Sequence, residues 1–433
     1  MKNKFKLIPL GLLILIIAFF TIKYLMPNSV LEVNNKKYVT SKLNLDDNDI
    51  AQENKASAMV NMDTNQILHQ NNEDKPFPVY SVSKVMFLAT TNEKMIKDGI
   101  SFDKKVRVLK GIDKVNQNAD FSKANLKSGD VYTIRELFDA VMIPSGNDAA
   151  ILLAYEVFGS HQNAVDAMNE NAKKWKMKNS SFISTSGLDG KYLNEVGIKA
   201  NDGKNMMSVN DNVVLLSRVI KDYPIIIESG SKKVSEIGIH NKKLNKLENV
   251  NEIIEGLGHS HINVYGLKTG SNIERHSNCI VALRKDSNDN TIASISLGSK
   301  TRAQLYNDVK AMYNYADQLK VINMQDHIEL NTSIASADKQ PDFTLDKPYY
   351  IYIKDNQLPQ IKIVDFSSKY NKSLNKYYSV NKGDNLGKVV FKDEKQFFNR
   401  KANNAPKITI KEDYNEKNLF LKAIEFLKDL IEK

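Results

Sequence analysis

Hydrophobic and polar positions along residues 56–316 predict strands at both ends of this segment and helices between them. The stretch ASAMVNMDTNQILHQ alternates apolar and polar residues on either side of residues 63–65, which predicts a β-hairpin. After Ser81, apolar residues recur at helical spacing until Gly99 provides a stop signal. The buried face expected for this helix comprises Val85, Leu88, Ala89, Met95 and Ile96.

The middle of the segment shows helical periodicity, and strand patterns return after it. Helices are predicted at 133–143, 148–159, 161–177 and 208–224, and strands at 262–270, 278–285 and 291–298. A closing helix at 302–316 places Leu305, Val309, Met312 and Ala316 on one face. Strands that flank a helical middle predict an α/β domain with helices packed on one antiparallel sheet.

The pattern changes near residue 324, where short strand-like runs such as PYYIYIKD and GKVVF alternate with polar residues. These runs predict a small all-β domain. The last stretch, NLFLKAIEFLKDLIEK, predicts an amphipathic helix that packs either on a membrane surface or on its own domain. We expect a signal or signal-anchor at 1–26, a linker at 27–52, a catalytic domain at 53–322, the β-rich domain at 323–412 and the amphipathic helix at 413–433.

The N-terminal residues predict export from the cytoplasm. Lys2, Lys4 and Lys6 precede an apolar run at 7–22, which is typical of a secretory signal or signal-anchor. Because no A-x-A cleavage site follows the run, an uncleaved anchor is favoured over a cleaved signal. The expected location is therefore extracytoplasmic, at a membrane surface, and a chain without disulfides suits a Gram-positive cell.

Composition narrows the possible partners. The 433 residues are 42% hydrophobic and 26% charged, and the net charge of +10 comes mostly from lysine. A lysine-rich surface either binds an acidic polymer or an anionic lipid, or is simply well solvated. The small number of arginines and the lack of a nucleic-acid-binding motif argue against binding to nucleic acid. The single cysteine, Cys279, excludes an intramolecular disulfide, and its apolar surroundings predict a buried structural thiol.

A Ser-x-x-Lys pair, Ser81 and Lys84, is the strongest candidate for chemistry. The same spacing occurs at five other serines, but only Ser81 follows a turn and opens a strongly apolar helix. Lys84 then lies one turn later on the same face, within reach of the hydroxyl. Burial favours a neutral amine, which is the base that a serine nucleophile needs. The backbone N–H of Ser81, at a helix start, can stabilise an oxyanion.

Two further short motifs follow in order along the chain. Ser145, Gly146 and Asn147 lie in a predicted loop between two helices, and Lys268, Thr269 and Gly270 lie at the end of a predicted strand. Each motif is weak by itself. Ser-x-x-Lys, Ser-x-Asn and Lys-Thr-Gly in this order, each at an element boundary, are the signature of penicillin-binding proteins and class A β-lactamases.

On these motifs, residues 56–316 resemble the serine-type D-alanyl-D-alanine carboxypeptidases, low-molecular-weight penicillin-binding proteins of the peptidase S11 family. The resemblance implies a penicillin-binding/β-lactamase-like transpeptidase domain, an antiparallel sheet with helices on both faces, followed by a small all-β domain. It also implies that Ser81 attacks the penultimate D-Ala of a peptidoglycan stem peptide, while Lys84 accepts the hydroxyl proton. No cofactor or metal is implied, and β-lactams are the expected covalent inhibitors.

The resemblance assigns the other motif residues as well. Ser145 relays a proton to the leaving amine and Asn147 bonds the substrate backbone. The substrate-binding residues are then Lys268, Thr269, Gly270, Ser271 and Arg302, of which Thr269 and Arg302 meet the terminal carboxylate. The backbone N–H of Ser271 serves as the second oxyanion donor.

The sequence departs from the family pattern at SNIERHSN, residues 271–278, which is about one residue longer than usual. This loop borders the leaving-group side of the site, so peptide preference is open. A β-lactamase is an alternative, although no Glu-x-x-x-Asn box lies between Asn147 and Lys268. A non-catalytic wall-binding protein that retains the fold is another. His259 and His261 lack the further ligands that a metal site needs.

Overall fold

The computed structural model describes residues 30–33, 54–238, 244–272, 274, 276–328, 330–333, 342–354, 358–365, 378–391, 405–412 and 414–416. The chain forms two compact units. One comprises residues 44–319, and the other combines residues 1–43 with residues 320–433. The two segments that flank the larger unit in sequence therefore belong to the same smaller unit.

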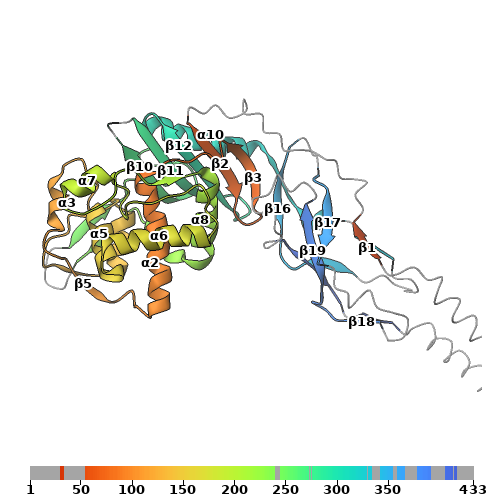
Figure 1. The fold of residues 1–433 in the computed structure, drawn as a ribbon. Coiled ribbons are helices and arrows are strands. Elements are labelled where there is room, and N and C mark those ends of the chain that lie inside the picture. Colours follow the sequence, from red (N-terminus) through yellow and green to blue (C-terminus); the bar gives the residue numbers. More distant parts are fainter. Residues whose placement is uncertain are drawn as a thin grey trace, which may run out of the picture. The chain divides into compact units, whose positions relative to one another are not determined.

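The larger unit is built on a five-stranded antiparallel sheet in the order β10-β11-β12-β2-β3 (Figure 1). Its strands are β2 (Ala56–Asn61), β3 (Gln66–Asn71), β10 (Val264–Asn272), β11 (Ser277–Lys285) and β12 (Thr291–Ser299). The predicted hairpin is confirmed as β2 and β3. N-terminal and C-terminal strands thus meet at the centre of one sheet, where β12 pairs with β2.

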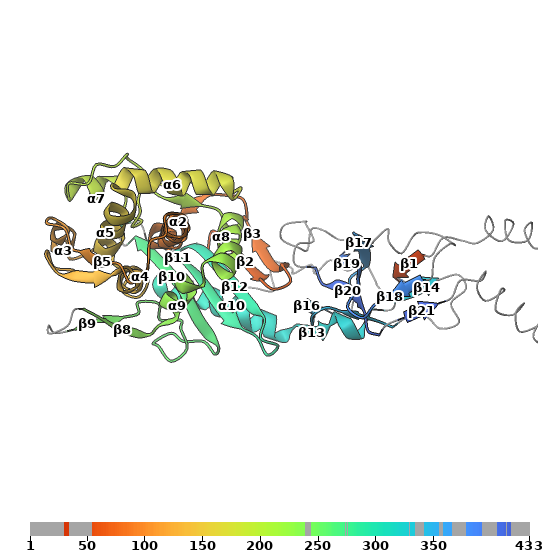
Figure 2. The same ribbon diagram turned by 90° about the horizontal axis from the view of Figure 1, so that it is seen from below.

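The helices occupy both faces of this sheet, as predicted from the resemblance. Figures 1 and 2 show α10 on one face and α8, α2 and α6 on the other. The helices are η3 (Tyr80–Ser83, a 3-10 turn), α2 (Lys84–Asp98), α3 (Asp113–Gln117), α4 (Ile134–Met142), α5 (Asn147–Phe158), α6 (His161–Lys174), α7 (Gly190–Glu195), α8 (Val209–Asp222), α9 (Pro224–Ser231) and α10 (Arg302–Gln318).

Two helix faces test the periodicity argument. In α10 the four predicted core residues are buried, because this helix covers the sheet with one face only. In α2 the prediction fails at Ile96, which is 67% exposed. Residues 84–92 of α2 are buried on all sides, whereas its last turn emerges into solvent, so helical spacing there does not mark a buried face. Gly99 ends α2 in the left-handed conformation, as predicted.

The helical middle also contains short strand pairs that the sequence pattern did not predict. They are β4 (Phe77–Pro78) with β7 (Met206–Met207), β5 (Lys105–Arg107) with β6 (Val131–Thr133), and β8 (Val234–Ile237) with β9 (Asn245–Glu248). Strands of two to four residues are too short to show an alternation. The pair β4–β7 matters most, because it brings the residues before Ser81 next to the segment that ends at Met206.

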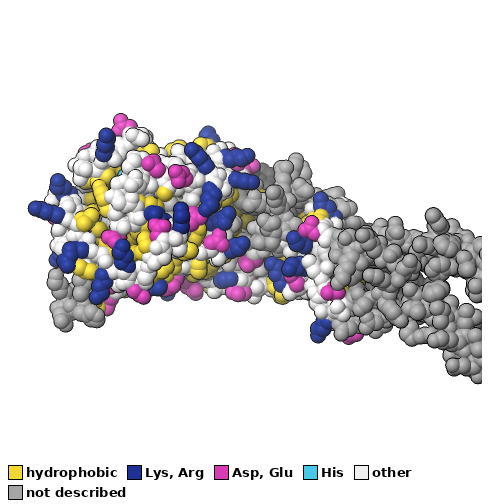
Figure 3. Space-filling view, turned by 60° about the horizontal axis from the view of Figure 1, so that its bottom comes forward, with side chains coloured by type: hydrophobic (Ala, Val, Ile, Leu, Met, Phe, Trp, Pro, Cys, Tyr) yellow, Lys and Arg dark blue, Asp and Glu magenta, His cyan; other side chains and the backbone are white. Residues whose placement is uncertain are grey.

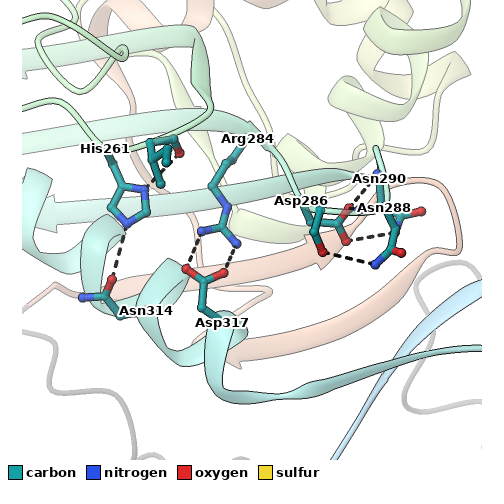
Figure 4. Close-up of polar contacts among 9 residues, drawn as sticks. His261, Arg284, Asp286, Asn288, Asn290, Asn314 and Asp317 are labelled. Carbon is teal, nitrogen blue, oxygen red and sulfur yellow. Dashed lines mark hydrogen bonds and ion pairs between the residues drawn. The ribbon is translucent and has the colours of Figure 1, made fainter.

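One end of the sheet is closed by polar contacts (Figure 4). Arg284 donates two hydrogen bonds to Asp317 of α10, at 2.8 and 2.6 Å. Asp286 accepts hydrogen bonds from the backbone N–H groups of Asn288 and Asn290 and so closes the β11–β12 turn. Strand register places this end opposite the end that carries Thr269 to Ser271.

Apart from one 3-10 turn, the described residues of the smaller unit form only strands and loops, as predicted for a small all-β domain. Its four-stranded sheet has the order β15-β20-β19-β17, and three two-stranded pairs complete it: β13–β16, β18–β21 and β1–β14. Its elements are β1 (Val30–Val33), β13 (Lys320–Asn323), η4 (Met324–Asp326), β14 (Leu330–Ser333), β15 (Phe343–Leu345), β16 (Tyr350–Ile353), β17 (Ile361–Val364), β18 (Tyr378–Val380), β19 (Asn385–Phe391), β20 (Lys407–Ile410) and β21 (Tyr414–Glu416). Its core includes Ile351, Ile361, Val389 and Ile408. Strand β1 lies within the segment expected to be a linker.

The predicted signal or signal-anchor at 1–26 lies outside the described residues. Of the predicted amphipathic helix at 413–433, residues 414–416 instead form strand β21, and the rest lies outside the described residues. Among the helices that the structure does describe, none combines the length and hydropathy needed to cross a membrane. On the face drawn in Figure 3, lysine and arginine side chains are interspersed with acidic ones and do not gather into one patch.

Candidate active site

Ser81 lies in a tight turn rather than in the α-helix itself. It is the second residue of η3, and Lys84 is the first residue of α2. In a 3-10 turn residues i and i+3 are eclipsed, which brings the two side chains closer than α-helical spacing does. Tyr80 before Ser81 has a φ of 46°, a left-handed conformation that non-glycine residues rarely adopt. The chain therefore turns sharply just before the candidate nucleophile.

The Lys84 amine is fully buried and has three polar neighbours. Its Nζ lies 2.8 Å from Ser81 Oγ and 2.7 Å from Asn147 Oδ1, and it also contacts the carbonyl oxygen of Ser186. The two carbonyl groups can only accept hydrogen bonds. A neutral amine has two N–H groups and one lone pair, so both N–H groups are taken by the carbonyls. Its lone pair then faces the Ser81 hydroxyl, the one neighbour able to donate.

Electrostatics favours this neutral form. Burial, together with the positive charge of Lys268, holds the pKa of Lys84 well below its usual range, and the Asp148 carboxylate opposes the shift only partly. Desolvation penalises an ammonium ion more than an amine. The geometry and the lowered pKa together support an amine that can accept a proton from Ser81.

The second motif lies at the junction of α4 and α5. Ser145 has a φ of 62°, and its buried Oγ has no hydrogen-bond partner among the described residues. Asn147 is the first residue of α5. The next residue, Asp148, accepts hydrogen bonds from the backbone N–H groups of Ala124 and Leu126, both at 2.9 Å. This buried carboxylate anchors the start of α5, so the Asn147 amide is held against Lys84.

The third motif lies within β10 and not at its end, because the strand continues to Asn272. Gly270 permits close approach to η3, since a Cβ there would lie 2.6 Å from Val79 O and 3.0 Å from Ser81 N. Lys268 is buried, and desolvation lowers its pKa to about 7. Cys279 opposes this shift, whereas the positive charge of Arg302, the first residue of α10, contributes to it.

The remaining predicted residues lie around this cluster. Thr269 is buried beside Lys268, whereas Ser271 is exposed. Arg302 is exposed and donates a hydrogen bond to Val250 O at 3.1 Å. In the segment 271–278, which departs from the family pattern, Glu274 forms an ion pair with Lys191 of α7 at 3.3 Å. The structure thus brings Lys84 into direct contact with both Ser81 and Asn147, and it places Gly270 against the Ser81 turn.

Several neighbours of the cluster were not predicted. The Ser186 carbonyl accepts a hydrogen bond from Lys84, and Gly187 packs so tightly on the Tyr80–Ser81 peptide that a Cβ would overlap it. Asn205 connects this segment to η3. A backbone carbonyl has no residue-type signature, and the only signal was that STSGLDG falls within the segment that resembles the family.

The two histidines near β10 take part in packing. His259 stacks on Tyr306 of α10 with ring centroids 4.9 Å apart, and His261 contacts Asn314 (Figure 4). Among the described residues no group of three or more His, Cys, Asp or Glu side chains is arranged to hold a metal ion. Cys279 is buried, as predicted, and donates a hydrogen bond to Val79 O at 3.0 Å.

Comparisons with known proteins agree with this geometry. Residues 44–301 match the model of the peptidase S11 family, described as D-alanyl-D-alanine carboxypeptidase. D-alanyl-D-alanine carboxypeptidase DacF of Bacillus subtilis is 26% identical over 270 residues, 62% of this chain and 63% of the relative. The chain spans about six tenths of the length of the curated relatives it matches.

Solved structures share the fold. A peptidoglycan synthesis regulatory factor (PBP3) from Streptococcus pneumoniae superposes with a TM-score of 0.70 at 17% identity, covering 84% of this chain and all of that one. Penicillin-binding protein D2 from Listeria monocytogenes, in a cefotaxime-bound form, has a TM-score of 0.50 at 23% identity, covering 61% of this chain and 98% of that one. At these identities the likeness establishes the fold, which confirms the predicted domain class.

Proposed function

The chain belongs to the D-alanyl-D-alanine carboxypeptidase family, peptidase S11, and we propose that it removes the terminal D-Ala from peptidoglycan stem pentapeptides through an acyl-enzyme on Ser81. The observation that carries this proposal is the 2.8 Å contact between the buried Lys84 amine and Ser81 Oγ. A serine hydroxyl is a weak nucleophile by itself, and an adjacent neutral amine is a sufficient base.

Acylation follows from the positions of these groups. Lys84 takes the hydroxyl proton while Ser81 Oγ bonds to the carbonyl carbon of the penultimate D-Ala. The negative charge on the carbonyl oxygen is stabilised by the backbone N–H groups of Ser81 and Ser271, each contributing about 3 kcal/mol. When the tetrahedral intermediate collapses, the C–N bond breaks and the amine of the terminal D-Ala leaves with a proton relayed by Ser145.

Substrate binding uses the positive charges beside this pair. Lys268 and Arg302 attract the terminal carboxylate, and Thr269 hydrogen-bonds it. Asn147 has an amide N–H₂ free to bond the peptide backbone once its oxygen is engaged by Lys84. Water then attacks the ester carbonyl, which releases the shortened peptide and returns the proton to Ser81. β-Lactams acylate Ser81 by the same steps.

The location follows from the proposed substrate and from the N-terminal sequence. Peptidoglycan stem peptides are reached outside the cytoplasm, and the basic flank before residues 7–22 supports export with the N-terminal segment held in a membrane. We propose an extracytoplasmic enzyme tethered at the cell surface.

Mass spectrometry of a purified stem pentapeptide tests the activity. Incubation with the protein should produce the tetrapeptide and free D-alanine, and Ser81→Ala should produce neither. Fluorescent penicillin should label the wild type and not Ser81→Ala. Labelling without peptide turnover would contradict the carboxypeptidase, rapid complete hydrolysis of nitrocefin would indicate a β-lactamase, and absence of both would indicate a wall-binding protein.

A further inference from the structure

Asn205, in the loop before β7, is a buried side chain whose polar atoms are all engaged. Its Oδ1 accepts hydrogen bonds from the backbone N–H groups of Ile183 and Ser184, at 2.8 and 3.1 Å. Its Nδ2 donates to Ser184 O and to Ser83 Oγ, both at 2.7 Å. Two backbone N–H groups on one side fix which atom is the oxygen, so the orientation of the amide is determined.

These bonds join the two segments that position the Lys84 amine. On one side, Ser83 Oγ donates to Tyr80 O at 2.6 Å, within the turn that carries Ser81. The Asn205 backbone carbonyl also accepts from Val79 N–H, at 3.1 Å. On the other side, residues 183 and 184 lead directly to Ser186, whose carbonyl accepts from Lys84.

The position of the Ser186 carbonyl matters because it determines where the amine lone pair points. With both N–H groups held by Ser186 O and Asn147 Oδ1, the lone pair faces Ser81. If Ser186 O moves away, the amine can rotate about its last bond and donate an N–H to Ser81 Oγ instead. A lysine in that orientation cannot accept the hydroxyl proton.

We propose that Asn205 is a positioning residue for acylation, which holds the Ser186 carbonyl where it directs the Lys84 lone pair at the Ser81 hydroxyl. This inference rests on the proposed function, because it assigns Lys84 as the base. Asn205 itself touches neither substrate nor the reacting atoms.

The kinetic test uses the full-length protein and a β-lactam whose binding and acylation steps are resolved. Asn205→Ala should lower the acylation rate constant about 100-fold, the usual effect of a displaced catalytic group. The dissociation constant of the complex before acylation should stay within about threefold of wild type, since ground-state binding is untouched. A change confined to that dissociation constant would overturn the proposal.

Asn61→Ala is the matched control. Asn61 is buried and accepts backbone hydrogen bonds from Asp63 and Thr64, but it lies at the other end of the sheet. It should acylate within about threefold of wild type despite a similar loss of side-chain hydrogen bonds. Equal acylation by Asn205→Ala and Asn61→Ala would overturn the proposal. Should Asn205→Ala not fold, Asn205→Asp, which keeps the acceptor and loses both donors, should still acylate at least about tenfold more slowly.

A crystallographic comparison separates this proposal from the proposed function. In Asn205→Ala, or in Asn205→Asp, the Ser186 carbonyl should have moved out of hydrogen-bond distance of Lys84 Nζ. A contact that stays intact overturns the role of Asn205, whether or not the wild type cleaves peptides. If the wild type is never acylated, the proposed function is overturned. A Ser186 carbonyl that is displaced in the Asn205 variants would even then show that Asn205 positions it.

Discussion

At the scale of single residues, one buried amine has its chemistry set by three oxygen atoms. Lys84 contacts Ser81 and Asn147 through side chains and Ser186 through the backbone. The first two could be predicted from the spacing and order of short motifs. The Ser186 contact could not be predicted, because any residue type supplies a backbone carbonyl. The role of Asn205 could not be predicted either, because it depends on a fold that joins distant segments.

Lys84→Met tests the base assignment with a side chain of similar length that cannot accept a proton. The rate constant for penicillin acylation should fall by about 10³-fold, within the range that positioned bases contribute. Stopped-flow or gel-based labelling measures it, and far-UV circular dichroism checks the fold. A folded Lys84→Met protein that labels at near wild-type rate would show that another group activates Ser81.

The lowered pKa of Lys268 predicts how kcat/KM should fall on the alkaline side of the pH profile. Its pKa is lowered to about 7, so above that pH the amine loses the positive charge that, in the proposed function, attracts the peptide carboxylate. For the free enzyme, kcat/KM for a D-Ala-D-Ala peptide should therefore decline as pH rises through about 7. Peptide hydrolysis measured from pH 5 to 10 gives the midpoint. A profile that stays flat across neutral pH would contradict it.

Arg302 should shift that decline in a defined direction. Its positive charge lowers the pKa of Lys268, so Arg302→Ala should raise this pKa and move the decline to higher pH. The same variant should weaken peptide turnover more than penicillin labelling, because it also removes a cation from the proposed carboxylate site. Arg302→Lys, which keeps the charge, is the control; a midpoint that is identical in all three proteins would exclude Arg302 from this role.

At the scale of elements, the site depends on how a strand approaches a turn. β10 lies so close to η3 at Gly270 that no Cβ fits between them, and Cys279 of β11 bonds the same turn. The main strands, α10 and the longer helices α2, α4, α5, α6 and α8 were predictable, because each is long enough to show its period. The short helices α3, α7 and α9 were not predicted. The short pairs β4–β7, β5–β6 and β8–β9 were not, and Ile96 failed because α2 is enclosed on all sides until its last turn.

Gly270→Ala tests this close approach. The new Cβ would overlap Val79 O, so β10 and η3 must separate, at a cost of about 1–3 kcal/mol in the free energy of unfolding. Acylation should slow by about 100-fold, since Ser81 moves relative to β10. Thermal unfolding and penicillin labelling measure the two effects.

Gly258→Ala is the control for this change, because its Cβ would meet nothing closer than 3.8 Å. It should leave both quantities close to wild type. Unimpaired labelling by Gly270→Ala would mean that the strand and the turn can separate without consequence for Ser81.

At the scale of the whole molecule, the chain forms two units with separate cores. The short strand-like runs that begin near residue 324 predicted the β-rich unit. The part played by residues 30–33 was not predictable, because their pairing partners lie 300 residues away in the sequence. Polar composition alone made this stretch resemble a spacer.

Calorimetry of the intact chain should resolve two unfolding transitions. Acylation by a β-lactam should raise the midpoint of one transition by a few degrees and leave the other unchanged, since ligand stabilises only the unit it binds. Ser81→Ala should show no shift with the same compound. A single transition, or an equal shift of both, would show that the two units unfold cooperatively.

The pairing of β1 with β14 has a consequence for how the protein is made and how it resists cutting. Both ends of residues 44–319 connect to the same smaller unit, so the larger unit is an insertion in the sequence of the β-rich one. During synthesis, the smaller unit cannot finish folding until residues 44–319 have been made. A single proteolytic cut at either junction would leave the larger unit covalently attached through the other junction.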